Sequence, residues 1–213
     1  LSEILTHIGH SEKVLVMRVF IAVLILIFSL QSSTKADDIR DFQIEGITIG
    51  DSLLNHITQK QFTDWEEYKY YYKDNKFAVT PCVLSPKEYD QVGCTYKIAE
   101  NGDHKIHGAH GTIKYPDNIP GCLKKKDEVS SQFKTLLKNT TINDYGTYVH
   151  DADPTGNSKQ TVIDFNFDNG GYIRVVCHDW SDKLTTERDW TDEFKVYITS
   201  KQLEYFINNE AYD

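Results

Sequence analysis

The sequence has few long apolar runs, few positive charges and few methionines. Its longest uninterrupted apolar stretch, from Val19 to Phe28, is well below the ~20 residues that a helix needs to span a bilayer. It also lacks G-x-S-x-G, H-E-x-x-H, a phosphate-binding loop and a dinucleotide-binding fingerprint. These absences argue against a transmembrane helix and leave the common hydrolase, zinc-protease and nucleotide-dependent enzyme classes without motif support.

Acidic residues outnumber basic ones along the chain. The 213 residues include 23 Lys and Arg against 32 Asp and Glu, a formal net charge of −9, and residues 37–213 alone hold 20 basic and 30 acidic residues. Such a surface repels the phosphates of nucleic acids and of anionic lipids. We therefore expect no nucleic-acid partner and no binding to membrane surfaces.

The single methionine, Met17, precedes one basic residue, the apolar stretch and a short end of small residues. This order is typical of a secretory signal peptide. We predict that residues 1–16 are upstream sequence outside the native protein and that residues 17–36 are a signal peptide cleaved after Ala36. The expected location is the periplasm or the extracellular space; an uncleaved anchor in the inner membrane is the alternative. Because no cysteine follows the cleavage site directly, lipid attachment there is excluded.

All four cysteines lie in residues 37–213, which are long enough for one domain with its own core. An even number of cysteines in an oxidising compartment predicts two disulfides. Cys122 lies on the apolar stripe of a predicted helix and Cys177 on the apolar face of a predicted strand, which favours a helix-to-sheet bridge between them. Cys82 and Cys94 flank a loop of 11 residues and favour a local bridge. Free buried thiols and other pairings are the alternatives.

The predicted elements indicate an α+β fold: antiparallel sheet with helices packed on one face. The order of elements also indicates two similar halves, near residues 42–115 and 119–207. The strongest turn signal is Asp168-Asn169-Gly170-Gly171. Strands are predicted at 42–49, 77–84, 93–98, 105–115, 145–149, 160–167, 172–178 and 194–199, and helices after Asp51, from Pro120 to near Asn139, and after Ser200.

The segment from Trp65 to Tyr72 is unusually rich in aromatic residues. Thr63 and Glu66 have the spacing of a capping box, which predicts a helix that opens this segment. We expect its aromatic rings to pack along an amphipathic helix; a carbohydrate-stacking surface is the alternative.

His104, His107 and His110 recur at intervals of three residues, and three imidazoles close together would suit zinc or copper. In a strand, however, His104 and His110 point one way and His107 the other. Only a β-bulge near Gly108 could bring all three together. Polar strand residues on a solvated face are therefore the favoured interpretation, and a metal site is the alternative.

The segment that begins at Asp151 resembles the start of a calcium-binding loop. Asp151, Asp153 and Thr155 place oxygen ligands at positions one, three and five, and Gly156 follows at position six. Position twelve is Val162 instead of a bidentate Glu. We therefore favour an ordinary Asx-rich turn.

Cys177 and His178 are adjacent, but neighbouring strand residues face opposite sides of a sheet and cannot form a catalytic dyad. His178, Asp179 and Ser181 hold the letters of a triad without its geometry. No catalytic residue and no cofactor are predicted.

The element order is similar to the tandem helix-plus-meander layout of small periplasmic β-lactamase-inhibitor-like and outer-membrane-assembly lipoprotein domains. A closer resemblance rests on four segments, Asp41–Leu54, Cys122–Glu128, Asp144–Gly146 and Cys177–Ser181. They look like a group of secreted proteins of Pelagibacter-type marine bacteria to which no activity is assigned. This resemblance implies export and a shared domain, and it names no catalytic residue.

Export, acidity and the missing motifs favour a non-enzymatic binding module whose partner is another macromolecule or an envelope component. A metal-binding protein that uses His104, His107 and His110 is the second hypothesis. A hydrolase with an unfamiliar site is the third.

Mass spectrometry of the exported protein under non-reducing conditions tests the compartment and the thiols together. We expect an amino terminus at Asp37 and a mass lower by four hydrogens than that of the reduced chain, because all four thiols are oxidised. A native protein that keeps residues 17–36, or that carries four free thiols, would contradict the prediction.

Overall fold

The computed structural model describes residues 38–99, 102–137 and 139–211. The predicted upstream residues 1–16 and the predicted signal peptide, 17–36, lie outside the described residues. Within these three ranges, no helix is both long and apolar enough to cross a membrane.

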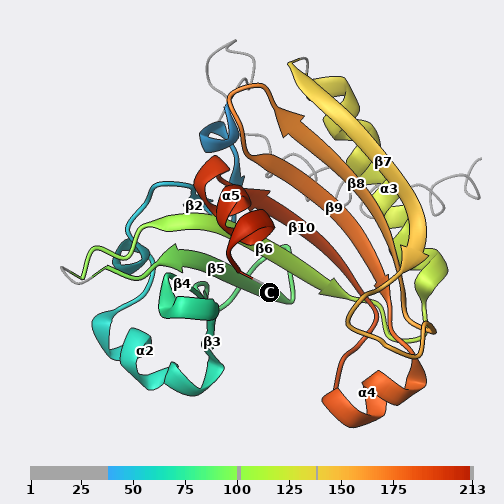
Figure 1. Cartoon of the computed structure of the whole chain (residues 1–213), viewed down its shortest axis with the longest axis horizontal. Helices are drawn as coiled ribbons and strands as arrows, with labels where there is room; N and C mark the ends of the chain where they lie inside the picture. Colours follow the sequence, from blue (N-terminus) through green and yellow to red (C-terminus); the bar gives the residue numbers. More distant parts are fainter. Residues whose placement is uncertain (1–37, 100–101, 138, 212–213) are drawn as a thin grey trace, which may run out of the picture. The chain divides into compact units, whose positions relative to one another are not determined.

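The fold is built on one eight-stranded antiparallel sheet in the order β3-β4-β5-β6-β10-β9-β8-β7 (Figure 1). Two four-stranded meanders, β3 to β6 and β7 to β10, meet where β6 pairs with β10. This confirms the α+β class with antiparallel sheet. The strands are β3 (Tyr70–Tyr71), β4 (Phe77–Pro81), β5 (Gln91–Lys97), β6 (Ile106–Lys114), β7 (Thr140–Val149), β8 (Lys159–Phe167), β9 (Tyr172–Asp179) and β10 (Glu193–Thr199).

Helix α3 (Ile119–Leu136) packs on β8, β9 and β10 from one side of the sheet, as predicted. The side chain of Asn118 accepts a hydrogen bond from the backbone N–H of Gly121 at 3.1 Å, and Pro120 lies in the first turn, so the sequence caps this helix locally. Helix α5 (Lys201–Asn209) lies on the opposite side, in front of the sheet in Figure 1. Ser200 caps it, as predicted, by accepting from the N–H of Leu203.

The core lies between α3 and the sheet. Alternate residues of β9 and β10 point toward α3 and are at most 2% exposed: Ile173, Val175, Cys177, Phe194, Val196 and Ile198. Phe133 of α3 meets Phe165 of β8 edge to face, with ring centroids 5.5 Å apart. Burial of such side chains stabilises a fold by about 1.5–3 kcal/mol each.

Both predicted disulfides are confirmed. Cys122 of α3 is bonded to Cys177 of β9, with Cα atoms 5.9 Å apart, and Cys82 is bonded to Cys94 with Cα atoms 5.7 Å apart. The described residues include no free cysteine. The first bridge ties α3 to the middle of the sheet, and the second closes the connection between β4 and β5.

The first predicted strand, 42–49, is instead a small hairpin of β1 (Gln43–Ile44) and β2 (Ile47–Thr48). Glu45 and Gly46 have φ angles of 52° and 83°, the left-handed conformation that a tight hairpin turn requires and that glycine adopts without strain. The next predicted helix is a single 3-10 turn, η2 (Leu53–Asn55), whose N-cap position is Ser52 instead of Asp51, and the Ser52 side chain makes no capping hydrogen bond. The carboxylate of Asp51 lies 3.0 Å from the ring of His56.

The prediction of a helix from Trp65 to Tyr72 is wrong. The capping box is formed by Thr58 and Gln61, and it opens the earlier helix α2 (Gln59–Asp64). The aromatic segment is a 3-10 turn, η3 (Glu66–Tyr68), followed by edge strand β3. Pairing of Tyr70 with Val79 of β4 overrides the local helix signal.

Three further short elements complete the described chain: η1 (Ile39–Asp41), η4 (Lys73–Asn75) and α4 (Asp182–Arg188). The hairpin between β8 and β9 turns at the predicted Asp168–Gly171 segment, where Gly170 and Gly171 both have positive φ.

Removal of the bridge between α3 and β9 should destabilise the protein more than removal of the local bridge. The bonded residues are 55 positions apart in the first case and 12 in the second, so the unfolded chain gains more entropy when the long loop opens. We expect the Cys122→Ala/Cys177→Ala variant to lose about 4 kcal/mol of unfolding free energy and the matched Cys82→Ala/Cys94→Ala variant about 3 kcal/mol. Urea unfolding monitored by tryptophan fluorescence measures both, and the reverse order would contradict the prediction.

Candidate functional site

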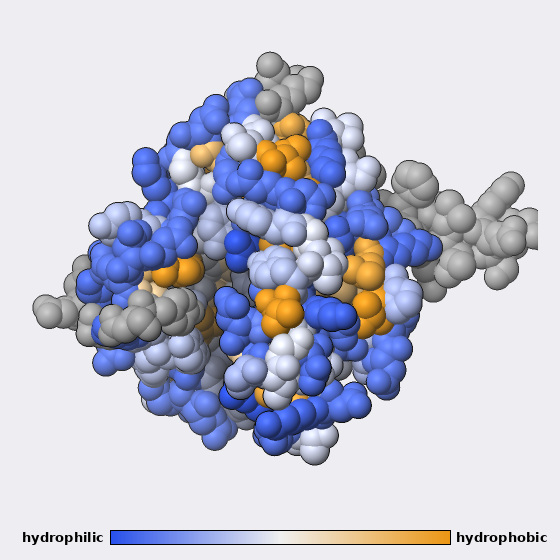
Figure 2. Space-filling model, turned by 45° about the vertical axis from the view of Figure 1, so that its right-hand side comes forward, coloured by the Kyte–Doolittle hydropathy of each residue, from blue (hydrophilic) through white to orange (hydrophobic). Residues whose placement is uncertain are grey.

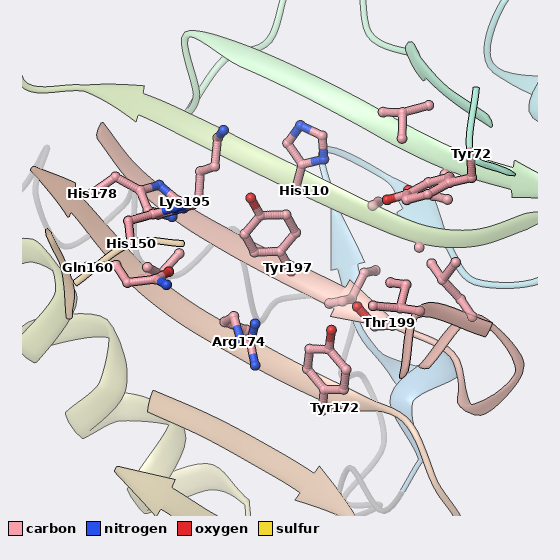
Figure 3. Close-up of a pocket in the computed structure, with 18 residues that line it drawn as sticks. Tyr72, His110, His150, Gln160, Tyr172, Arg174, His178, Lys195, Tyr197 and Thr199 are labelled. Atoms are coloured by element: carbon pink, nitrogen blue, oxygen red, sulfur yellow. The ribbon is translucent and has the colours of Figure 1, made fainter. Parts of the chain in front are cut away.

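The sheet face that points away from α3 carries polar and aromatic side chains that line a cavity of about 410 Å³. The alternation that sends Cys177 into the core sends its neighbours on β9 to this face. In Figure 3 the side chains of β6, β9 and β10 project from the same side of the ribbon into one space. Helix α5 bounds the cavity at one end, where Leu203 and Ile207 contribute to its wall.

One ion pair crosses between β8 and β9 on this face. Arg174 and Asp164 are directly opposite in the strand register, and the guanidinium donates from Nε and Nη2 to the two carboxylate oxygens at 2.8 and 2.7 Å. Asp164 is almost fully buried. Burial by itself lowers the pKa of Arg174, but the hydrogen bonds to Asp164 outweigh it and the pKa is raised. Arg174 therefore stays charged, and the two hydrogen bonds orient its guanidinium against the carboxylate of Asp164.

A second charged group lies along β10. Lys195 Nζ is 2.6 Å from Glu193 Oε1, and His178 Nδ1 is 3.4 Å from the same oxygen. Burial by itself raises the pKa of Glu193, but contact with His178 and the charge of Lys195 outweigh it and lower the pKa. Burial by itself lowers the pKa of Lys195, but Tyr197 and Glu193 outweigh it and raise the pKa. The carboxylate and the ammonium therefore remain an ion pair.

Three histidines complete the polar lining. Burial lowers the pKa of His110 to about 4, and burial is also the main cause of the lowered pKa values of His150 and His178. At neutral pH all three rings are therefore uncharged. The rings of His150 and His178 meet edge to face, with centroids 5.4 Å apart.

The ring of His110 occupies the space beside Gly93, its partner on the neighbouring strand β5. A Cβ atom at Gly93 would come within 2.4 Å of this ring, so only glycine leaves room for it. Tyr197 of β10 lies on the other side, with ring centroids 5.3 Å apart. His110 thus has a fixed position at the centre of the face (Figure 3).

The structure does not bring His104, His107 and His110 together. His104 stacks on Phe62, with ring centroids 4.7 Å apart, and His107 Nδ1 lies 3.1 Å from Ser200 Oγ at the start of α5. A bulge does occur at His107, where the register with β5 shifts, but it does not converge the three rings. Within the described part of the chain, no cluster of three His, Cys, Asp or Glu could hold a metal ion.

The calcium-like loop uses its oxygen atoms within the protein. Asp153 is 3% exposed, and its carboxylate accepts hydrogen bonds from Thr155, Ser158 and Ser181. The hydrogen bonds from Ser158, and then those from Thr155, hold the pKa of Asp153 well below its usual range. Asp151 is exposed on the same turn. Asp153 therefore ties the loop after β7 to the segment after β9.

Cys177 and His178 face opposite sides of the sheet, as their adjacency predicts: Cys177 is bonded to Cys122 in the core, and His178 lines the cavity. Ser181 contacts Asp153. The sequence patterns did not predict the two ion pairs or the tyrosines of the face. Their signal was present as polar residues at alternate positions of three strands, but such residues are also typical of a solvated face.

No family model, curated protein or solved structure matches the chain. The resemblances to periplasmic inhibitor-like domains and to the Pelagibacter-type secreted proteins therefore remain predictions.

The neutral state of His110 predicts a dependence of stability on pH. An unfolded histidine takes up its proton near pH 6.5, whereas the folded pKa is about 4, so the unfolded state binds more protons between these values. Stability should therefore fall as the pH falls from 6.5 to 4. We expect His110→Gln to reduce this loss by roughly 3 kcal/mol, at ~1.4 kcal/mol per pKa unit. Urea unfolding across this pH range measures it, and parallel profiles for parent and variant would refute the assignment.

Proposed function

We propose that this protein is an exported binding protein that holds a macromolecule or an envelope component against the polar face of its sheet. The observation that supports the proposal most strongly is the pair of ordered ion pairs, Arg174–Asp164 and Lys195–Glu193, on a concave face next to a cavity. Clefts with a few convergent polar groups are the usual form of binding sites.

Folding alone gives little reason for these charges. Buried ion pairs often contribute less to stability than apolar side chains of similar size, because removing two charges from water is costly. The opposite face of the same strands is apolar and fully packed. The charged groups of this face are therefore better explained by ligand recognition than by folding stability. Their pairing fixes hydrogen-bond donors and acceptors in defined directions.

The acid–base properties of the face favour binding over hydrolysis. The pKa of Glu193 is lowered, which is opposite to the rise that a general acid needs at neutral pH. The described cavity lining contains no serine or cysteine, and the thiol nearest in sequence, Cys177, is bonded to Cys122. The two disulfides are compatible with an oxidising compartment, which supports the export part of the proposal.

A tryptophan introduced on this face should block the partner. Gln160 lines the cavity, whereas Lys159 is exposed and precedes it on β8, so that strand alternation places the two on opposite faces. We expect the full-length protein carrying Gln160→Trp to lose at least tenfold of its capture of envelope or periplasmic components. The matched control Lys159→Trp should capture as the parent does.

The measurement is quantitative mass spectrometry of components retained by the immobilised protein, counted only when parent and control retain them equally. Equal retention by the Gln160→Trp variant, with its fold verified by circular dichroism, would reject the polar face as the binding surface.

A further inference from the structure

The charged side chains that line the cavity are paired with opposite charges of the protein, so the cavity has almost no unpaired charge for a ligand. Arg174 and Lys195 are each paired with a carboxylate, and the histidines that line it are uncharged at neutral pH because burial lowers their pKa values. A charged ligand would lose its hydration and would find no unpaired opposite charge in the described lining. A neutral polar ligand avoids this cost.

The imidazoles of the lining can also form hydrogen bonds with a neutral ligand. His178 Nδ1 is buried and lies 3.4 Å from Glu193 Oε1, so this atom faces the carboxylate instead of the cavity. His110 also lines the cavity and is only partly buried, so its ring is open to a ligand. A neutral imidazole has one donor and one acceptor, and a hydroxyl group can serve both.

Aromatic rings stand beside these polar atoms. Tyr172 and Tyr197 line the cavity, and burial raises the pKa of both, so their hydroxyls remain protonated donors at neutral pH. Tyrosine offers an apolar ring and a polar tip together. A ligand that matches it has apolar C–H faces and hydroxyl edges, which is the chemistry of a sugar ring.

The lining continues beyond the cavity into a second groove of about 460 Å³. His110 and Val79 belong to both, so the two hollows adjoin on the same face. The groove is bordered by Tyr68 and Tyr70, which are 63% and 55% exposed. The molecular face seen in Figure 2 is mostly hydrophilic, with apolar residues in small separate groups. The face therefore offers two adjoining subsites, both open to solvent, of which the second has exposed aromatic walls.

We propose that this face binds a neutral glycan, with one terminal sugar unit in the cavity between His110, His178 and Tyr197 and the next units along the groove at Tyr68 and Tyr70. The proposal rests on the binding function proposed above and names the chemistry of its ligand. The cavity volume of about 410 Å³ lies near the lower end of the ~300–1,000 Å³ typical of small-molecule sites, which fits a unit of one or two rings.

Saturation-transfer NMR and titration calorimetry test the proposal with defined probes on the full-length protein. The probes are neutral hexoses and N-acetylhexosamines, their neutral oligosaccharides, and glucuronic acid and glucosamine as charged analogues. We expect at least one neutral series to bind and its charged analogue to bind at least tenfold more weakly, because the charge would enter unpaired.

Matched variants locate the ligand. His110→Phe keeps a ring beside Gly93 but removes both ring nitrogens, and it should raise Kd at least tenfold. His104→Phe, at an imidazole stacked on Phe62 outside the cavity, should leave Kd unchanged. Tyr70→Ala, at an exposed edge position, should weaken oligosaccharides and leave the monosaccharide unaffected. If His110→Phe does not fold, Gln160→Trp gives the same test from the cavity wall.

Three outcomes would overturn the glycan assignment: no neutral sugar binds at millimolar concentration, charged analogues bind as tightly as neutral ones, or His104→Phe and His110→Phe act alike. If Gln160→Trp still abolishes capture of the envelope partner in that case, the binding function stands and only the ligand class falls. If the Gln160→Trp variant also captures the envelope partner normally, both the proposed binding function and the glycan assignment are rejected.

Discussion

Packing of α3 against one face of the sheet determines which side chains point to the other face. The Cys122–Cys177 bridge fixes which residues of β9 point toward the helix, and the period of two in a strand then sends their neighbours to the opposite side. A shift of the register by one residue would place Arg174 in the apolar core and Val175 in the cavity. Packing of the core therefore determines which side chains form the polar face, although the core side chains lie on the other side of the sheet.

The polar face in turn depends on cross-strand partners. Arg174 is opposite Asp164, Lys195 extends beside Glu193, and the ring of His110 needs the absent side chain of Gly93. Lys195 and Glu193 both belong to β10, but the other partners come from different strands, and His178 of β9 also contacts Glu193. The face therefore exists only when β5, β6, β8, β9 and β10 are aligned together. Each charge of the two ion pairs on this face has an opposite charge within hydrogen-bond distance, which is a condition under which a protein can keep charges away from water.

Much of the framework could be predicted because it follows from local rules. Helical spacing placed Cys122 on a buried stripe, alternation placed Cys177 on a buried face, and Gly170 and Gly171 marked a hairpin. The prediction of a helix in the aromatic segment after Trp65 is wrong because pairing of Tyr70 with β4 is stronger than a helix signal of a few residues. The sequence indicates His104, His107 and His110 as a possible group, but of these three only His110 lines the cavity.

The sequence by itself determined the fold class and the absence of familiar catalytic motifs, and it favoured both disulfide pairings. Helix stripes, strand alternation and turn residues are encoded within a few neighbouring positions. Only the tertiary structure decided that the second face of the sheet is a lined cavity instead of a solvated surface. Polar residues at alternate strand positions have the same local pattern in both cases. The difference is made by β6 pairing with β10 and by α5 closing one end, contacts between segments far apart in the chain.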